Sequence, residues 1–178
     1  MIAPEGRVVM ISGANRGIGL AIATNLYSAG FCLSLGARDD AGLKNTIKDW
    51  DKSRVLVCRY DALDKETHMA WINSTVNQFG RLDGLVNNAG IWKNFSVFDE
   101  SGDEEDLDLM WAVNVKAPVS LTKKALPHLR KSGVGRVVNV ASLAGKAVFG
   151  SEVGYSMTKF ALVALSHAIR QGGWDDGV

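Results

Sequence analysis

Two residues near the C-terminus, Tyr155 and Lys159, form a pair that could move a proton. They lie four positions apart in a stretch with helical apolar spacing, so their side chains share one face of a helix. A free phenol has a pKa of about 10, and a neighbouring ammonium lowers that pKa by favouring the phenolate. Such a pair can exchange a proton with a carbonyl or alcohol oxygen near neutral pH. Alone the signal is weak, because the same spacing also occurs on ordinary helix surfaces.

A second pattern is the glycine-rich turn Ser12-Gly13-Ala14-Asn15-Arg16-Gly17-Ile18-Gly19. It follows an apolar run at 7–12 and opens an apolar helical pattern at 17–29. Glycines permit positive φ and close approach of the backbone to a pyrophosphate, and a helix N-terminus offers free N–H groups. The order strand, turn and helix therefore predicts a dinucleotide site. The spacing is Gly-x-x-x-Gly-x-Gly, which differs from the Gly-x-Gly-x-x-Gly of most dinucleotide enzymes.

The elements that must position these residues alternate along the chain. We expect strands at 7–12, 31–37, 54–58, 82–86 and 136–140. We expect helices at 17–29, 41–51, 64–78 and 152–171. Another helix should follow an irregular stretch at 91–106, which is acidic in its second half, and run to about 130, with Pro118 as a possible kink. Continuous apolar strands alternating with helices predict an α/β fold, a doubly wound parallel sheet of the Rossmann type. Ligands of such sheets bind at the carboxyl ends of the strands.

Length and composition exclude several classes of protein. The chain has 178 residues, 20 basic and 19 acidic side chains and a formal net charge of +1, so we expect one domain that binds neither nucleic acid nor an anionic membrane surface. It has no apolar run long enough to span a membrane. Cys32 and Cys58 form no disulfide framework, which fits a cytoplasmic location. His68, His128 and His167 fall on three predicted helices, so we expect no metal site.

Five motifs in order resemble the classical branch of the short-chain dehydrogenase/reductase family. They are the glycine turn at 12–19, Asn87-Asn88-Ala89-Gly90 after the fourth strand, Asn114, Ser142, and Tyr155-x-x-x-Lys159. Thirteen positions separate the serine from the tyrosine, which is the family's usual interval. Ser12 replaces the family's threonine, and either hydroxyl can bond the backbone. The motifs cover nearly the whole chain.

The resemblance implies hydride transfer between a nicotinamide cofactor and a small carbonyl or secondary alcohol substrate. It assigns Tyr155 as the acid/base and gives Lys159 two roles, lowering the pKa of the tyrosine and binding the nicotinamide ribose. Ser142 is expected to bond the substrate oxygen, and Asn114 to hold a water that links the lysine to solvent. A homodimer or homotetramer is also implied, formed through the helix of Asn114 and the apolar segment 160–165. Residues that could line a substrate pocket, or simply pack in the core or an interface, are Trp92, Phe95, Phe98, Ala144, Val148 and Phe149.

The end of the second strand bears on the choice of cofactor. The family's usual acidic position there falls on Ala37, whereas Arg38 follows at once and Arg16 lies in the glycine turn. A guanidinium suits the 2′-phosphate of NADP, so we expect NADP rather than NAD. The other interpretation uses Asp39 as the acid that binds the ribose of NAD. The full set of expected cofactor residues is Gly13, Asn15, Arg16, Gly17, Ile18, Gly19, Arg38, Asp61, Ala62, Asn88, Ala89, Gly90, Tyr155 and Lys159.

Several alternatives stay open. Asp61 could contact adenine, as the resemblance implies, or serve only as a turn or capping residue. The protein could also be a cofactor-binding sensor without turnover, a catalytically incompetent fragment, or an epimerase or dehydratase of the family's extended branch. Family members usually have further strands after the fifth. We therefore expect residues 1–178 to be a single domain truncated at its C-terminus, and the native chain to continue beyond Val178.

Overall fold

The computed structural model describes residues 3–150 and 153–178. Five parallel strands form one sheet in the order β3-β2-β1-β4-β5. The strands are β1 (Val8–Ser12), β2 (Cys32–Ala37), β3 (Val55–Arg59), β4 (Gly84–Asn87) and β5 (Arg136–Asn139). The direction of winding reverses between β1 and β4, and a crevice opens at the carboxyl ends of strands at such a point. The predicted doubly wound sheet is confirmed.

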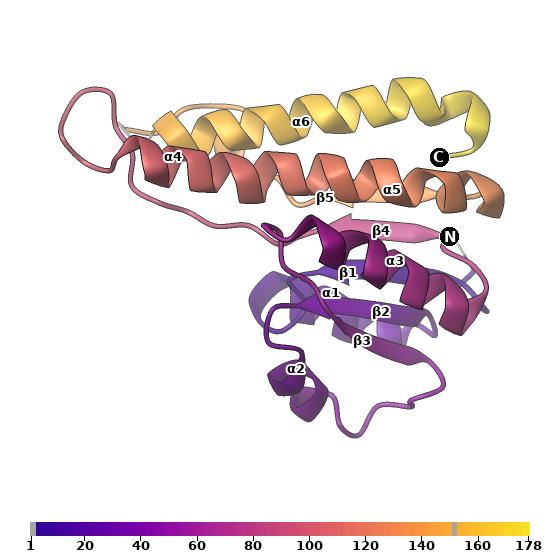
Figure 1. Cartoon of the computed structure of the whole chain (residues 1–178). Helices are drawn as coiled ribbons and strands as arrows, with labels where there is room; N and C mark the ends of the chain where they lie inside the picture. Colours follow the sequence, from indigo (N-terminus) through magenta and orange to yellow (C-terminus); the bar gives the residue numbers. More distant parts are fainter. Residues whose placement is uncertain (1–2, 151–152) are drawn as a thin grey trace.

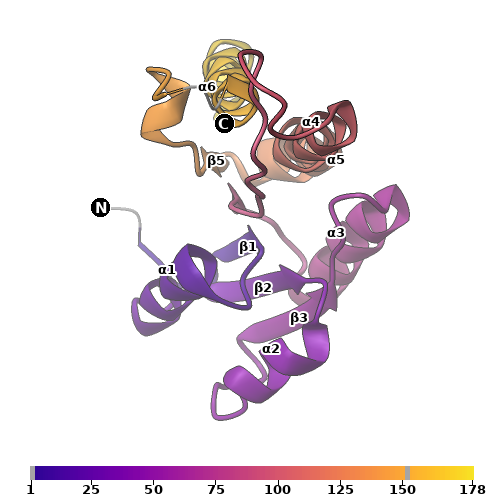
Figure 2. The same cartoon turned by 90° about the vertical axis from the view of Figure 1, so that its left-hand side faces the viewer.

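Six helices connect and cover the strands (Figure 1). They are α1 (Gly17–Ser28), α2 (Asp40–Thr46), α3 (Lys65–Phe79), α4 (Glu104–Trp111), α5 (Ala117–Ser132) and α6 (Val153–Gly173). A π-helical segment, η1 (Ala112–Lys116), joins α4 to α5, and short 3₁₀ turns occupy Leu143–Gly145 and Trp174–Asp176. Figures 1 and 2 show α6 running alongside α4 and α5, so these helices lie together at the β5 end of the sheet.

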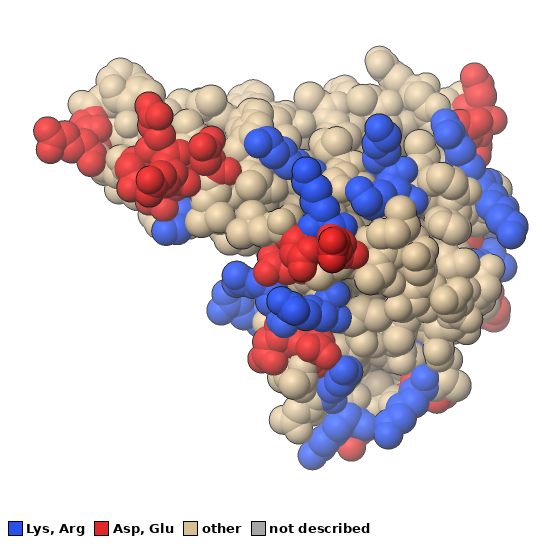
Figure 3. Space-filling view, viewed as in Figure 1, with Lys and Arg blue, Asp and Glu red and all other residues tan. Residues whose placement is uncertain are grey.

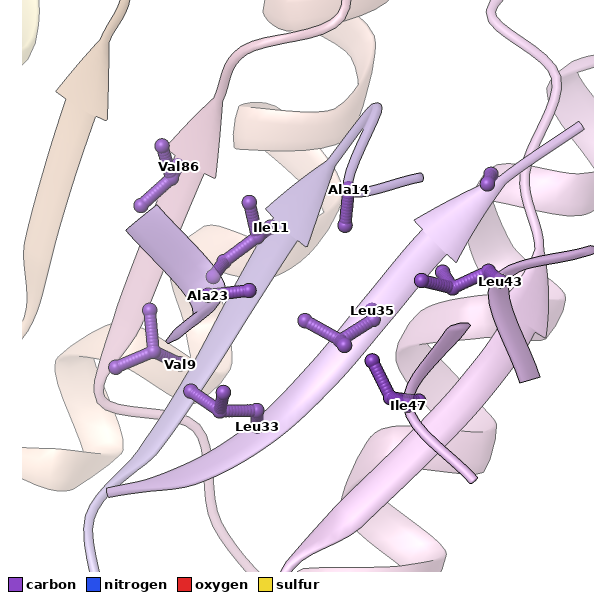
Figure 4. Close-up of a cluster of buried hydrophobic side chains, with 10 residues drawn as sticks. Val9, Ile11, Ala14, Ala23, Leu33, Leu35, Leu43, Ile47 and Val86 are labelled. Carbon is purple, nitrogen blue, oxygen red and sulfur yellow. The ribbon is translucent and has the colours of Figure 1, made fainter. Parts of the chain in front are cut away.

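Alternate residues of the strands build two separate cores, one on each face of the sheet. On the first face, Val9 and Ile11 of β1 meet Leu33 and Leu35 of β2, and Ala23 of α1 covers them (Figure 4). Leu43 and Ile47 extend this cluster to the segment of α2. All of these side chains are buried, so the apolar pattern of the sequence is satisfied within the chain.

On the second face, Met10 of β1 lies with Leu85 of β4 under α3 and α5. Trp71 is the largest fully buried side chain of α3, and its indole N–H donates to Ser34 Oγ of β2 at 2.8 Å. Leu121 of α5 completes this face. Both cores therefore anchor β1 and β4 from opposite sides, and they hold the ends of these two strands in a fixed relation.

Three helix predictions differ from the structure. The helix predicted at 41–51 ends at Thr46, because Ile47 turns into the first core and Trp50 stacks on Tyr27 with ring centroids 4.3 Å apart. The predicted kink at Pro118 is wrong; the irregularity is the π-helical segment just before it, and Pro118 stands in the first turn of α5, where proline is tolerated. The last helix ends at Gly173 rather than 171, and its predicted start at Glu152 lies outside the described residues.

The acidic stretch before α4 is a loop and the first turn of a helix, as predicted. Asp103 is the N-cap, and its carboxylate accepts from the backbone N–H of Asp106 at 2.8 Å. Glu104, Glu105 and Asp106 occupy the first turn, where negative charge interacts favourably with the helix dipole. Figure 3 shows the acidic side chains gathered at this end of the molecule.

Candidate cofactor cavity and reaction centre

The turn between β1 and α1 brings the N-terminus of α1 to the crevice without a side-chain cap. Gly13 and Gly17 have φ angles of +65° and +55°, which explains why glycine occupies both positions. α1 starts at Gly17 after an extended Arg16, with no side-chain cap and no acidic residue in its first turn. A Cβ on Gly17 would meet nothing within 4 Å, so the space before the helix is open. This cradle fits an anionic group such as a pyrophosphate.

Ser12 and Asn88 join the glycine turn to the end of β4. Ser12 Oγ accepts from the backbone N–H groups of Asn88 and Ala89, each at 3.0 Å, and donates to the Val86 carbonyl. The amide of Asn88 donates to the carbonyls of Ser12 at 2.9 Å and Gly13 at 3.1 Å. The prediction that the Ser12 hydroxyl bonds the backbone is confirmed. These bonds fix the two strand ends on either side of the switch point.

A cavity of about 750 Å³ lies at this edge of the sheet. Among the expected cofactor residues, those that line it are Gly13, Asn15, Arg16, Gly17, Ile18, Arg38, Asp61, Ala62, Asn88, Ala89 and Gly90. Gly19 lies beneath the turn instead: a Cβ there would collide with the Gly13 carbonyl oxygen and lie 2.5 Å from Asn88 Nδ2. Gly19 therefore shapes the cradle by close packing and does not line it.

The end of β2 and the glycine turn beside it bring two arginines and one carboxylate to the cavity. Ala37 is 2% exposed, whereas Arg38 and Arg16 are exposed and line the cavity. Asp39 also lines it, but its carboxylate caps α2 by accepting from the Gly42 backbone N–H at 2.9 Å. Two guanidinium groups therefore lie at this end of the cavity beside a carboxylate that also caps a helix.

Asp61 follows β3 and has the turn role considered for it, whereas its contact with adenine stays a prediction. Its carboxylate accepts from the Leu63 backbone N–H at 3.0 Å, which is a turn contact, and the residue also lines the cavity. Tyr60, beside it, is buried, lines the cavity as well, and has a pKa raised by burial. Behind this turn, His68 of α3 contacts the Asp61 carbonyl.

Lys159 lies between the cavity edge and Tyr155. Its side chain is buried, its Nζ donates to the Val140 carbonyl at 3.0 Å, and the same atom lies 5.4 Å from the centroid of the Tyr155 ring. A Cβ built on Gly90 would be 3.7 Å from Nζ, so the ammonium lies directly beside the cavity lining. Burial lowers the pKa of Lys159. The predicted pairing of tyrosine and lysine on one helix face is confirmed.

Asn114 occupies the π-helical segment and ties it to the loop after β4. Its carboxamide accepts from the Ile91 backbone N–H at 2.8 Å and donates to the Ile91 carbonyl at 2.8 Å. It also donates to Thr158 Oγ1 at 3.1 Å. The side chain is therefore engaged with protein groups in α6 and the loop, and its expected role in holding a water stays a prediction. π-helical segments are frequent at functional sites.

Ser142 and Tyr155 lie at the amino ends of successive elements. Ser142 is exposed and caps the 3₁₀ turn by accepting from the Ala144 N–H at 3.1 Å. Tyr155 is half-buried in the first turn of α6. Within the described part of the chain, the residues that line the cavity do not include Ser142, Tyr155 or Lys159. Contact between Ser142 and Tyr155 stays a prediction.

The loop after β4 contributes lining residues that the motifs do not specify. Ile91 and Lys93 of this loop, with Leu109 and Val113 of the α4–η1 region, line the cavity. Lys93 forms an ion pair with Asp106 at 2.9 Å. Ile91 and Lys93 follow directly after the Asn-Asn-Ala-Gly motif, and this position is the one signal in the sequence that could have identified them as lining residues.

The aromatic candidates of the loop after β4 have different environments. Trp92 lines the cavity, whereas Phe95 packs against Gly154 at the start of α6 and Phe98 is 81% exposed. Only the first of these therefore faces the cofactor cavity.

Residues 3–150 and 153–178, which the structure describes, hold neither a membrane-spanning helix nor a metal-binding cluster. No helix in these ranges is long and apolar enough to cross a membrane. The same ranges contain no group of three or more histidine, cysteine or acidic side chains arranged to hold a metal ion.

Comparisons with known proteins agree with the fold. The profile of a family described as short chain dehydrogenase matches residues 7–178. The agropine synthesis reductase of Rhizobium rhizogenes is 42% identical over 171 residues, which cover 96% of this chain and 39% of the reductase. The structure of a short-chain dehydrogenase from Streptomyces avermitilis has 30% identity and a TM-score of 0.89, covering 96% of this chain and 62% of that one.

A structure with bound cofactor is also similar. A short chain dehydrogenase/reductase from Burkholderia phymatum in complex with NAD has 26% identity and a TM-score of 0.89, with 97% of this chain and 62% of that chain covered. The chain thus spans about two fifths of the reductase and less than two thirds of both of these solved chains.

Proposed function

The chain belongs to the short-chain dehydrogenase family, and from this premise we propose that it is an NADP(H)-dependent oxidoreductase acting on a carbonyl or a secondary alcohol. The observation that carries the proposal is the position of the Lys159 ammonium. It lies beside Gly90 of the cavity lining and 5.4 Å from the centre of the Tyr155 ring. One cation can therefore act both on a bound cofactor and on the phenol that exchanges the proton.

The proposed chemistry divides the work between a few side chains. When bound, the nicotinamide supplies or accepts the hydride. Tyr155 gives a proton to the carbonyl oxygen during reduction, or takes one from the alcohol during oxidation. Lys159 stabilises the phenolate form of that tyrosine and bonds the ribose. Ser142 holds the substrate oxygen, and a donor aimed at a developing oxyanion is worth about 3 kcal/mol.

The preference for NADP rests on charge at the end of β2. Arg16 and Arg38 both line the cavity, and planar guanidinium groups suit a 2′-phosphate. Asp39 is the carboxylate that could bind the 2′-hydroxyl of NAD, but it already accepts the Gly42 N–H as the cap of α2. Asp39 would have to serve both partners, so the arginines favour NADP.

Direction and assembly are part of the proposal. The name of the Rhizobium rhizogenes relative, a reductase, favours the reductive direction with a small carbonyl substrate. We also propose a homodimer or homotetramer through α5 and α6. Val119, Met157 and Phe160 are 42%, 44% and 43% exposed on these helices, and a second copy would bury them.

The cofactor proposal is tested by binding. The chain should bind NADPH more tightly than NADH in isothermal titration calorimetry. Arg38→Ala should weaken NADPH by about tenfold or more, the value of one charge-assisted hydrogen bond, and change NADH binding much less. Equal losses for both cofactors would contradict the role of Arg38.

The catalytic proposal is tested by turnover. A panel of ketones and aldehydes, followed by NADPH absorbance, should yield at least one reduced substrate. Tyr155→Phe should abolish turnover and leave the affinity for NADPH within about twofold of the original, because the change removes a single oxygen atom. Retained turnover would refute the acid/base assignment. A chain that binds NADPH but reduces nothing in the panel would instead fit cofactor binding without turnover.

A further inference from the structure

His68 is a buried titratable residue directly behind the cavity, and the proposed chemistry does not use it. It lies in α3 with no exposed surface, and its Nε2 is 3.1 Å from the carbonyl oxygen of Asp61. Asp61 and Ala62 line the cavity on the other side of the same turn. The imidazole therefore supports the backbone from which this edge of the cavity is built.

The hydrogen bonds around His68 fit a neutral ring. Lys124 Nζ donates to Ser120 Oγ at 2.9 Å, and that oxygen lies 3.3 Å from Nδ1 of the ring. With its oxygen accepting from the lysine, Ser120 can donate its own proton to Nδ1. Nε2 then carries the ring proton and donates it to the Asp61 carbonyl. Both ring nitrogens are satisfied by a neutral imidazole.

The groups that face the ring disfavour a second proton. Burial lowers the pKa of His68, and the charge of Lys124 on α5 acts in the same direction. The carbonyl of Asp61 and the charge of Asp64, which precedes α3, oppose this. The Tyr60 ring packs on the imidazole with centroids 5.1 Å apart and carries no charge near neutral pH. Protonation at Nδ1 would also remove the acceptor that the Ser120 hydroxyl uses.

We propose that His68 is a positioning residue for the adenosine end of the cofactor cavity, and that its neutral ring holds Asp61 and Ala62 in the arrangement that binds cofactor. The inference rests on the proposed function, because it takes the ligand of the cavity to be a dinucleotide. Acidification adds a proton at Nδ1, which displaces the Ser120 hydroxyl from that nitrogen and turns a positive charge toward the Lys124 ammonium. The repulsion shifts the ring away from α5 and disturbs the turn that the ring supports. Cofactor affinity then falls with pH through a residue that does not touch the cofactor.

A Thr67 variant distinguishes a pH-dependent role of His68 from simple structural support of the Asp61 turn. Its hydroxyl contacts the same Asp61 carbonyl at 3.1 Å and the Asp64 carbonyl at 2.6 Å, but it does not titrate. It therefore holds the turn equally at every pH. A pH dependence that disappears with the histidine and survives in a Thr67 variant belongs to the imidazole.

The test compares NADP⁺ binding by the chain and by His68→Gln from pH 7.5 to pH 5.5, using calorimetry. The Gln amide can donate to the Asp61 carbonyl and does not titrate. The phosphate of the cofactor also titrates in this range and affects both proteins equally. Its effect therefore cancels in the ratio of the two dissociation constants. We expect a ratio that changes by about three- to tenfold across this range, the value of one neutral hydrogen bond. His167→Gln, on the exposed face of α6, should show the same pH profile as the unchanged chain.

Nuclear magnetic resonance of the imidazole supplies a second measurement that needs no variant. Because binding and protonation are linked, NADP⁺ should lower the measured pKa of His68. A constant affinity ratio, or a pKa of His68 unaltered by cofactor, would overturn the inference alone. Failure of the unchanged chain to bind NADP⁺ or NADPH at pH 7.5 would overturn the proposed function and the inference with it.

Discussion

Gly19→Ala should damage the cofactor cradle without touching a lining residue. The added methyl would collide with the Gly13 carbonyl oxygen and lie 2.5 Å from Asn88 Nδ2 and 2.9 Å from the Gly13 carbonyl carbon. Neither partner is a flexible side-chain end that can simply rotate away, because the Asn88 amide is held by the carbonyls of Ser12 and Gly13. The turn must move away from α1, or the amide must leave its two acceptors.

The size of the effect follows from these contacts. Forcing an extra carbon into a packed site costs about 1 to 3 kcal/mol. Loss of the two amide hydrogen bonds adds about 0.5 to 1.5 kcal/mol each. Alanine regains about 1 kcal/mol relative to glycine in a helix. The net loss in the free energy of unfolding should therefore be about 3 kcal/mol, within a range of about 1 to 5 kcal/mol.

Urea unfolding and NADPH calorimetry measure the two consequences of Gly19→Ala. The midpoint of unfolding should fall, and affinity for NADPH should fall at least tenfold because Gly13 and Asn88 both line the cavity. Gly172→Ala is the matched control: this glycine lies in α6, and a Cβ there would meet nothing within 4 Å. It should be neutral or slightly stabilising. A Gly19→Ala protein with unchanged stability and affinity would refute the close-packing argument.

Two further predictions concern buried polar groups. Burial raises the pKa of Tyr60, so the folded chain resists forming the phenolate; stability should be unaffected below about pH 10 and fall as the pH rises beyond it. Tyr60→Phe should flatten this loss when unfolding is compared at pH 8 and pH 11, and an unaltered slope would contradict it. Asp83 accepts from the Val8 backbone N–H at 2.9 Å and forms a bidentate ion pair with Arg81, so Asp83→Ala should cost about 2 to 4 kcal/mol by urea unfolding. Asp83→Asn keeps an acceptor oxygen for Val8 but loses the charge of the ion pair, and it should cost less; equal costs would mean that the ion pair, and not the bond to Val8, carries the stabilisation.

The sequence predicted the elements that carry a strong local signal. The apolar strands, the glycine turn before α1 and the spacing of Tyr155 and Lys159 each follow from a few neighbouring residues. The chain order of strands and helices then restricts the sheet to a doubly wound form. The Ser12 hydroxyl was predicted to bond the backbone, and its partners at the end of β4 follow from that topology.

Features set by contacts between distant segments could not be predicted in this way. α2 ends early because Ile47 enters a core built from β1 and β2, and no residue nearby announces it. The π-helical segment at Ala112–Lys116 contains neither glycine nor proline, and the bonds from Asn114 to Ile91 and Thr158 link it to elements far along the chain. His68 drew attention only as a lone histidine, because Ser120 becomes its neighbour only through packing of α3 against α5.

The end of β4 contacts both the glycine turn and the region of Asn114 and Lys159. Asn88 reaches toward β1 and fixes the cradle, whereas Gly90, two residues later, lies beside Asn114 and Lys159 of the reaction centre. The absence of a side chain on Gly90 matters here, because its Cβ would lie 3.3 Å from Asn114 Oδ1 and fill the space between the cavity and the lysine. In the proposed function, this short segment holds a bound cofactor against Lys159, and through it against Tyr155. Fixing this segment by bonds from both sides makes the proposed hydride and proton transfers geometrically compatible.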